Sequence, residues 1–346
     1  MIPAKGYAAQ NAESDLAPWE FERRDVGAHD VQIEILYCGV CHTDYHLTKN
    51  EWFPGLFPMV PGHEIVGRVV AVGGHVQKFT TGDAAGVGVM VDSCRHCENC
   101  DNGQEQFCLD GGVLTYNNPD REGKPAYGGY SNTIVVHERY VHVISEKLDL
   151  AAVAPLLCAG ITTYSPLRKW NVGKGHKLAI VGLGGLGHLG VKFGLAFGAE
   201  VTVLSTSESK RKDAKALGAH NFVVTRIPEE AATVTAAFDF ILDTVAADHD
   251  IAPYLAMLRT NGTYINVGMP AKPLDVSAFT LASGNKTVAG SGAGGMPETQ
   301  EMLDFCANHN IVSDIELINI KDINTAFERM LKGDVRYRFV IDMKTL

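Results

Sequence analysis

Lys177-Leu178-Ala179-Ile180-Val181 runs directly into Gly182-Leu183-Gly184-Gly185-Leu186-Gly187, and this stretch decides the fold of the second half of the chain. The apolar run predicts a buried strand, and the apolar segment after the glycines predicts a helix to about Phe197. Between a strand and a helix, Gly-x-Gly-x-x-Gly is the fingerprint of a dinucleotide-binding turn, in which Gly182 turns the chain, Gly184 admits the pyrophosphate and Gly187 packs against the strand. A tight turn without a ligand is the alternative.

The next predicted strand, residues 200–204, ends without the acidic residue that an NAD site places there to accept from the ribose 2′-hydroxyl. Small hydroxyls and a nearby cation follow instead, and these suit a 2′-phosphate. We therefore expect NADP(H), bound by Ser205, Thr206, Ser207 and Lys210. Lysine-rich helix starts are also common on surfaces and Glu208 lies close by, so NAD or no preference is the alternative.

Strands and helices alternate from about residue 154, which predicts βαβ units and a parallel sheet. Later strands are expected at residues 238–242, 263–268 and 287–289. Val267 and Gly268 would then lie at the carboxyl edge of the sheet, where the nicotinamide end of a dinucleotide should arrive. A helix is expected at residues 297–307, and a final strand at 338–341 is expected to return to the first domain.

In the first half, residues 1–36 alternate polar and apolar and predict strands that lead to Cys41-His42-Thr43-Asp44-Tyr45-His46. The glycine-rich run 62–74 is expected to form a strand pair, with bends or bulges at Gly67 and Gly73. Cys41, His63, Glu64 and Cys158 together form a soft, mostly neutralised donor set that suits Zn²⁺. Their wide spacing is typical of a catalytic site with an open position, although each residue taken alone could be an ordinary core residue. The aromatic and aliphatic residues between the two parts of this set line either an apolar substrate pocket or the core: Trp52, Phe53, Leu56 and Phe57.

Three residues beside Cys41 suggest proton chemistry. Thr43 and His46 are close enough to lie on one side of a helical turn, where a hydroxyl and an imidazole could relay a proton to solvent. Asp44 could accept the spare ring N–H of His63 and fix its tautomer. The alternatives are a helix cap for Thr43 or Asp44 and a surface position for His46.

The sharpest local motif is Cys94, Cys97, Cys100 and Cys108, with spacings of two, two and seven residues. Four thiolates this close can enclose one zinc tetrahedrally and staple a lobe at about residues 92–110. An iron–sulfur cluster is less favoured, because no proline follows the last cysteine and no second cluster motif occurs. The acidic lobe also argues against a nucleic-acid-binding zinc ribbon.

Composition limits the possible classes further. The 346 residues predict about two domains, with 46% hydrophobic and 20% charged residues, as in an ordinary globular chain. A net charge of −10 without a basic run argues against nucleic-acid or anionic-lipid partners. We see no signal peptide and no membrane span. Six of the eight cysteines have metal-ligand spacings, which favours a reducing compartment, so a cytoplasmic location is expected.

Over essentially its full length the chain resembles the zinc-dependent medium-chain dehydrogenase/reductase superfamily. Gly62-His63-Glu64-x-x-Gly67-x(5)-Gly73-x-x-Val76 is similar to its zinc signature, and Cys94/Cys97/Cys100/Cys108 to its structural-zinc lobe. The residues 41–46, 58–64 and 205–210 resemble the cinnamyl-alcohol-dehydrogenase subfamily, including its bacterial aldehyde reductases. The resemblance implies that Cys41, His63 and Cys158 hold a catalytic zinc, that Glu64 can swing in, that Thr43 and His46 relay a proton, and that Thr162 touches the cofactor.

The resemblance further implies an α/β chain with a GroES-like, β-rich catalytic domain (1–153 and 295–346) and a Rossmann NADP-binding domain (154–294). It implies two zinc ions per chain, a homodimer, and interconversion of primary alcohols and aromatic or aliphatic aldehydes with NADP(H), mainly by aldehyde reduction. The alternatives are an NAD-dependent polyol or amino-alcohol dehydrogenase and a non-catalytic zinc protein that binds a dinucleotide.

Overall fold

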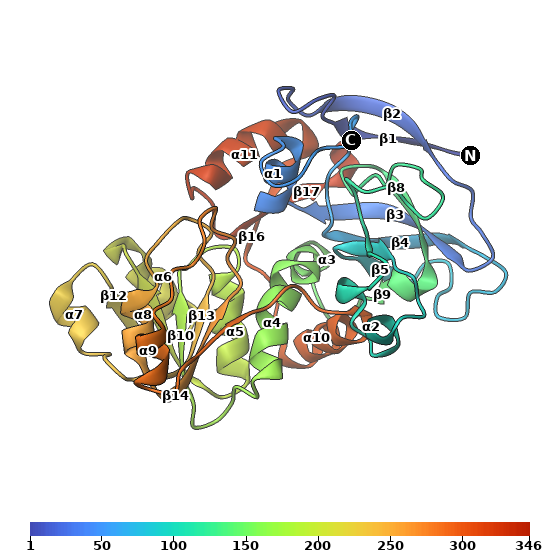
Figure 1. Cartoon of the computed structure of the whole chain (residues 1–346). Coiled ribbons are helices and arrows are strands. Elements are labelled where there is room, and N and C mark those ends of the chain that lie inside the picture. Colours follow the sequence, from blue (N-terminus) through green and yellow to red (C-terminus); the bar gives the residue numbers. More distant parts are fainter. The chain divides into compact units, whose positions relative to one another are not determined.

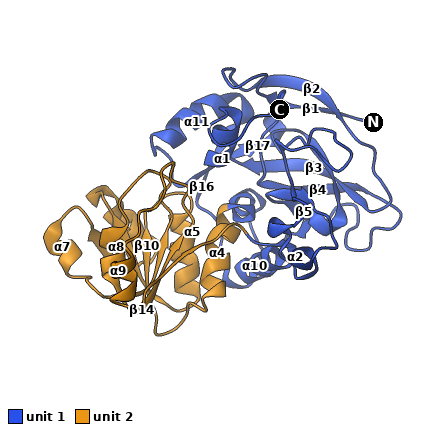
Figure 2. Ribbon diagram, viewed as in Figure 1, with its two compact units in different colours: residues 1–158, 294–346 blue, residues 159–293 orange.

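The computed structural model describes residues 1–346, and these form two compact units. Unit 1 comprises residues 1–158 and 294–346, and unit 2 comprises residues 159–293 (Figure 2). The domain limits expected from sequence lie at 153/154 and 294/295. The chain thus leaves unit 1 once and returns to it, so that residues far apart in sequence share one sheet.

Unit 2 is a six-stranded parallel sheet with the order β12-β11-β10-β13-β14-β15 (Figure 1). This is the order of a doubly wound dinucleotide-binding fold, and it confirms the predicted fold class. In such a sheet all carboxyl ends lie at one edge. The strands are β10 (Lys177–Val181), β11 (Glu200–Ser205), β12 (Asn221–Val224), β13 (Phe238–Asp243), β14 (Leu258–Asn266) and β15 (Thr287–Gly290).

Helices cover both faces of this sheet, with α4 (Ala159–Lys169) and α5 (Gly187–Ala196) on one side and α8 (Ala252–Met257) and α9 (Ala278–Ala282) on the other (Figure 1). The two remaining α-helices are α6 (Arg211–Ala216) and α7 (Pro228–Ala232). The strand expected at 263–268 begins earlier and stops at Asn266. Val267 and Gly268 therefore lie in the loop that leaves the sheet edge.

Unit 1 is built on a seven-stranded, mostly antiparallel sheet with the path β16-β17-β3-β4-β5-β9 and β8 paired to β3. The C-terminal strand β17 lies beside β3 (Figure 1), so the expected return of the chain is observed. A separate hairpin joins β1 to β2, and β6 pairs with β7. The bounds are β1 (Ile2–Ala8), β2 (Ala17–Arg23), β3 (Asp30–Gly39), β4 (Ile65–Val72), β5 (Ala84–Val87), β6 (Met90–Asp92), β7 (Val113–Leu114), β8 (Thr133–His137), β9 (His142–Val143), β16 (Ile315–Asn319) and β17 (Arg338–Asp342).

The glycine-rich run 62–74, which the sequence suggested to be a strand pair, forms the single strand β4. A Cβ at Gly67 would lie 2.0 Å from the carbonyl oxygen of Glu34, so this glycine allows β3 and β4 to approach rather than turning the chain. The pairing of β3 with β4 is irregular between Ile35 and Tyr37, directly opposite this point. The register irregularity expected at Gly67 is thus found at its pairing with Ile35, on the partner strand β3, whereas the expected strand pair was wrong.

The helices of unit 1 are short and lie at the ends of strands or over the sheet. They are α1 (His42–Thr48), α2 (Glu98–Asp101), α3 (Leu150–Val153), α10 (Met296–His309) and α11 (Ile323–Leu331). No single helix is long and apolar enough to cross a membrane. Two consecutive helical segments have the length and apolar composition of a membrane span only when counted together, namely Leu150–Leu157 and Ala159–Lys169. Most of their residues are buried in the protein.

Candidate functional site

The site begins where β3 ends and α1 starts. Cys41 precedes α1 in extended backbone, which turns its thiol away from the helix axis. Asp44 closes the helix start, because its Oδ2 accepts from the backbone N–H of Cys41 at 2.9 Å. Cys41 therefore lies directly before the helix and Thr43 lies in its first turn. The Thr43 hydroxyl is 3.5 Å from the Cys41 sulfur.

Four donor side chains meet beside this helix start. Ligand atoms of Cys41, His63, Glu64 and Cys158 all lie within 4.8 Å of one another. The sulfurs of Cys41 and Cys158 are 3.9 Å apart, close to the roughly 3.8 Å expected between two thiolates on one tetrahedral zinc. Two thiols, one imidazole and one carboxylate are a donor set that zinc accepts, so the residues present fit this metal.

Asp44 is the centre of the hydrogen bonding around the site and is fully buried. Besides Cys41, it accepts from the backbone N–H of Gly62 at 3.1 Å and from the hydroxyl of Tyr130 at 3.1 Å. Its Oδ1 lies 3.2 Å from Nδ1 of His63. That contact directs Nε2 of His63 toward the thiols, as expected for a carboxylate that orients a metal-binding histidine.

Glu64 is held by an arginine that the sequence did not single out. Its Oε1 pairs with Nη2 of Arg338, while its Oε2 is buried and has no hydrogen-bond partner. Burial raises the pKa of Glu64 to about 7, although Arg338 opposes this rise. Since a carboxylate oxygen of Glu64 belongs to the group of four donors, Glu64 can be an additional metal ligand beside its ion pair with Arg338.

The pKa values of the two thiols shift in opposite directions, so that Cys158 keeps its proton more firmly than Cys41. A hydrogen bond from Cys158 lowers the pKa of Cys41 well below its usual range, and the Cys41 thiolate together with burial raises the pKa of Cys158. Burial opposes a charged His63, but the Asp44 carboxylate raises its pKa well above the ordinary value. A metal that binds here must displace these protons.

His46 lies on α1 three residues after Thr43, on the same helical face. Its Nδ1 is 2.5 Å from Oε2 of Glu51, and its ring stacks on Trp52 with centroids 4.5 Å apart. Glu51 is a residue that the sequence analysis missed. Trp52, which the sequence assigned to either a pocket or the core, is half-buried, and its ring packs against the imidazole of His46.

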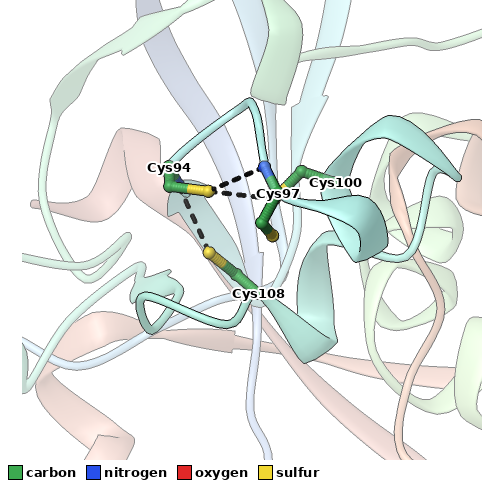
Figure 3. A group of neighbouring side chains, drawn as sticks. All are labelled: Cys94, Cys97, Cys100 and Cys108. Carbon is green, nitrogen blue, oxygen red and sulfur yellow. Dashed lines mark hydrogen bonds between the residues drawn. The ribbon is translucent and has the colours of Figure 1, made fainter.

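The second thiol group surrounds the short helix α2. The sulfurs of Cys94, Cys97, Cys100 and Cys108 lie within 4.8 Å of one another and gather around a common centre (Figure 3). Cys94 and Cys100 have sulfurs 3.8 Å apart. The spacing predicted this cluster, and four soft sulfur donors fit a zinc whose four coordination positions are all filled by the protein.

Backbone N–H groups stabilise negative charge on these sulfurs. Cys97 donates to the sulfur of Cys94 at 3.3 Å, and Leu109 donates to the sulfur of Cys97 at 3.4 Å. The Leu109 amide is the main reason that the pKa of Cys97 falls to about 6. None of the eight cysteines forms a disulfide. The lobe is therefore arranged for thiolates rather than for oxidised sulfur.

The glycine turn between β10 and α5 has a geometry that a dinucleotide-binding turn would need. Gly182 has φ +85°, a backbone that favours glycine. A Cβ at Gly184 would meet nothing within 4 Å, so the backbone there is open to an approaching ligand. A Cβ at Gly187 would lie 2.1 Å from the carbonyl oxygen of Gly182. The three glycines thus serve three different steric needs, and Gly185 and Leu186 complete the turn.

The end of β11 leaves small hydroxyls at the sheet edge. Ser205 Oγ accepts from the backbone N–H of Ser207 at 3.1 Å, and Thr206 is exposed. Glu208, the acid that could have favoured NAD, is bound by Arg211, which also pairs with Glu230. Lys210 is not part of that cluster. Thr162, on α4, is half-buried.

The chain is similar to known proteins over nearly its full length. Residues 27–146 match the alcohol dehydrogenase GroES-like domain, and residues 185–308 match the zinc-binding dehydrogenase model. The aldehyde reductase YahK of Escherichia coli is 54% identical over 346 residues, which cover 99% of each chain.

Two solved structures are similar throughout. A cinnamyl alcohol dehydrogenase from Sorghum bicolor superposes with a TM-score of 0.96 at 46% identity, covering 99% of this chain and 98% of the other. The enzyme named CAD from Helicobacter pylori, in complex with NADP(H), gives a TM-score of 0.93 at 44% identity and covers 99% of both chains.

Proposed function

The chain belongs to the zinc-binding alcohol dehydrogenase family with a GroES-like domain, as its zinc signature predicted. From this premise we propose that it interconverts primary alcohols and aldehydes with NADP(H), mainly by reducing aldehydes of the cinnamyl, aromatic or aliphatic type. The observation that carries the proposal is the donor set of Cys41, His63 and Cys158 with Asp44 behind it. Two thiols and one imidazole drawn from distant parts of the chain are typical of a catalytic zinc with an open position, and Asp44 orients the imidazole for it.

Each chain is proposed to bind two zinc ions. Cys41, His63 and Cys158 would hold the catalytic ion, with Glu64 as an additional ligand. The ion of the lobe would be held by Cys94, Cys97, Cys100 and Cys108. When bound, zinc polarises a carbonyl oxygen as a Lewis acid and NADPH is the source of hydride.

The residues of the chain then handle one proton. Thr43 is placed next to Cys41, so its hydroxyl can donate to the oxygen of a substrate that lies by the thiols. His46 would return a proton to Thr43 from solvent, because a fifth of its side chain is exposed. Glu51 holds Nδ1 of His46 and thereby leaves Nε2 for the transfer. Asp44 keeps His63 in one tautomer throughout.

The preference for NADP(H) is proposed to come from Ser205, Thr206, Ser207 and Lys210. The support is the absence of a free carboxylate at the end of β11, since Glu208 is bound by Arg211. Gly182, Gly184, Gly185, Leu186 and Gly187 would hold the pyrophosphate, and Thr162, Val267 and Gly268 the nicotinamide end.

A substrate panel with both cofactors tests this function. We expect kcat/KM for an aromatic aldehyde to be at least about tenfold higher with NADPH than with NADH, the gain of a charge-assisted bond to the 2′-phosphate. Equal values would contradict the NADP assignment. Oxidation of sorbitol with NAD at a higher rate than any aldehyde reduction would favour a polyol dehydrogenase instead, and no turnover of any aldehyde would favour a non-catalytic protein.

We also propose a homodimer in the cytoplasm. The edge strand β15 leaves one side of the six-stranded sheet unpaired, and Phe279 on α9 is 82% exposed. None of the eight cysteines forms a disulfide, and six have metal-ligand positions, which favours a reducing compartment. Light scattering on the purified protein at micromolar concentration should give twice the chain mass of 37.3 kDa, and a mass of one chain would exclude the dimer.

A further inference from the structure

A buried carboxylate at the end of β13 takes no part in the function proposed above. Asp243 is fully buried, and its Oδ2 lies 2.7 Å from Nε2 of His249 and accepts from the hydroxyl of Tyr264. Its Oδ1 accepts from the backbone N–H of Val245 at 2.9 Å. The loop 243–249 is thus folded back on its first residue. These residues all belong to unit 2, so neither of the two thiol groups, which lie in unit 1, is involved.

The same loop contacts both segments expected to bind the dinucleotide. The carbonyl of Asp243 accepts from the backbone N–H groups of Val267 and Gly268 at 2.9 and 3.1 Å. The hydroxyl of Thr244 donates to the carbonyl of Val181 at 2.8 Å, just before the glycine turn. A Cβ at Gly182 would lie 3.0 Å from a methyl of Val245. The position of this loop therefore sets the distance between the glycine turn and Val267-Gly268.

The geometry assigns a positive charge to His249. Its Nε2 faces the Asp243 carboxylate, and its Nδ1 faces the carbonyl of Ala247 at 2.8 Å. Both partners are acceptors, and a neutral imidazole has only one N–H to donate. Only the imidazolium satisfies both contacts. Loss of its proton would leave one ring nitrogen facing an oxygen without a hydrogen bond.

The groups around His249 support that charge. Asp243 from β13 and Asp250 from the same loop are acidic, while Tyr254 from α8 and Tyr264 from β14 are neutral. Asp248 is already paired with Lys272, at 3.6 Å. Burial works against the charged ring, but the Ala247 carbonyl and the Asp243 carboxylate raise the pKa of His249 above its ordinary 6.5.

We propose that protonated His249 is a positioning residue that clasps the loop 243–249 and thereby holds the glycine turn and Val267-Gly268 in the form that binds a dinucleotide. The inference rests on the proposed function, because it takes these two segments as the cofactor site. Since the clasp lies at β13 and β14 and not at the end of β11, it affects NADPH and NADH alike. Affinity for both weakens as His249 loses its proton, at pH values above 6.5.

The clasp is tested by titrating the zinc-containing protein, free of dinucleotide, with NADPH and with NADH. Binding is followed by nucleotide fluorescence between pH 6 and pH 9. For the wild type we expect both dissociation constants to rise by about tenfold across this range, the loss of one charge-assisted bond. His249→Gln can donate one neutral hydrogen bond at every pH, so its dissociation constants should not follow that rise. His249→Leu should bind both dinucleotides about tenfold more weakly than the wild type at pH 6.

Lys210→Ala is the matched control, because it should weaken NADPH alone and keep the pH dependence of the wild type. kcat at saturating cofactor should change little in the His249 variants, since the residue does not touch substrate. Wild-type affinity and wild-type pH dependence in His249→Leu would overturn the clasp. Failure of the wild type to bind either dinucleotide would overturn the proposed function instead, and the two results cannot be confused.

Discussion

Cys41 and Cys158 come from positions 117 residues apart, whereas Cys94, Cys97, Cys100 and Cys108 follow one another within a single short segment. The first set is mixed, with one imidazole and one carboxylate, and most of it is buried. The second set has only sulfur donors and lies near the surface. Similar atoms in unit 1 thus form two groups with different surroundings.

The surroundings decide what each group can do. The mixed set has Asp44, Tyr130 and Arg338 behind it, which fix the direction and charge of its members. The lobe has mainly backbone N–H groups, which stabilise thiolates but move no proton. We therefore expect damage to the mixed set to remove activity and leave the fold, and damage to the lobe to lower stability first.

The largest effect is expected from His63→Ala. This change removes the only imidazole of the mixed set, so aldehyde reduction should fall by about a thousandfold or more. The thermal midpoint should stay within a few degrees of the wild type. His96→Ala, at an exposed histidine within the lobe, is the control and should keep full activity. A His63→Ala protein with more than a tenth of wild-type kcat would contradict the division of roles.

Cys108→Ser should mainly affect stability. Losing one of four thiolates opens the closed set, and we expect the free energy of unfolding to fall by about 3–5 kcal/mol. Denaturant titration of the purified protein measures it. Cys306→Ala, a buried thiol outside both groups, should cost about 1 kcal/mol. If Cys108→Ser abolished activity at unchanged stability, the lobe would not be the structural member of the pair.

Asp44→Asn tests the carboxylate behind the mixed set. The amide keeps the size of the side chain but cannot accept from His63, Gly62 and Tyr130 as a carboxylate does, so metal affinity should drop by about 10–100-fold. In a competition with a coloured chelator, one of the two metal ions should be released at a lower chelator concentration than in the wild type. Asp149→Asn, the same substitution at the cap of α3, serves as the control, because Asp149 contacts none of the four donors. Unchanged retention of both ions would show that Asp44 only caps α1.

The smallest effect concerns acid stability and arises outside both thiol groups. His142 on β9 is buried, its Nδ1 has no partner, and burial lowers its pKa to about 3. A folded-state pKa below the unfolded value of 6.5 favours the neutral ring, so this stability is complete above pH 6.5 and is lost as pH falls toward 3. The loss is at most about 1.4 kcal/mol per pH unit.

His142→Phe should therefore move the acid unfolding midpoint to lower pH, by roughly half a unit. Circular dichroism during acid titration measures this midpoint. His220→Phe, at an exposed histidine of unit 2, is the control. If both variants unfolded at the wild-type pH, the buried neutral ring of His142 would not contribute to the acid sensitivity of the fold.

Much of this contrast was predictable from sequence because it depends on residue types with few other uses. Cys41, His63 and Cys158 could be grouped by ligand chemistry, and the lobe by its spacing alone. Arg338 could not be found, because it meets Glu64 across 274 residues and no local pattern indicates such a partner. Glu51 was missed because its role depends on the chain turning after α1, where its backbone N–H donates to the carbonyl of His46 at 2.9 Å.

The fold shows the same limit. The sheet of unit 2 followed from one strand, three glycines and a helix, all adjacent in sequence. In unit 1 the run 62–74 was wrongly divided into two strands, because a glycine that permits close approach resembles one that turns the chain. Only the position of β3 beside Gly67 distinguishes the two cases.

The most direct test is a zinc count on purified wild-type and His63→Ala proteins, each measured together with aldehyde reduction. The account predicts two zinc ions per wild-type chain, and one per His63→Ala chain, which stays folded and inactive. Two tightly held ions in an inactive His63→Ala protein, or a single ion in a fully active wild type, would contradict it.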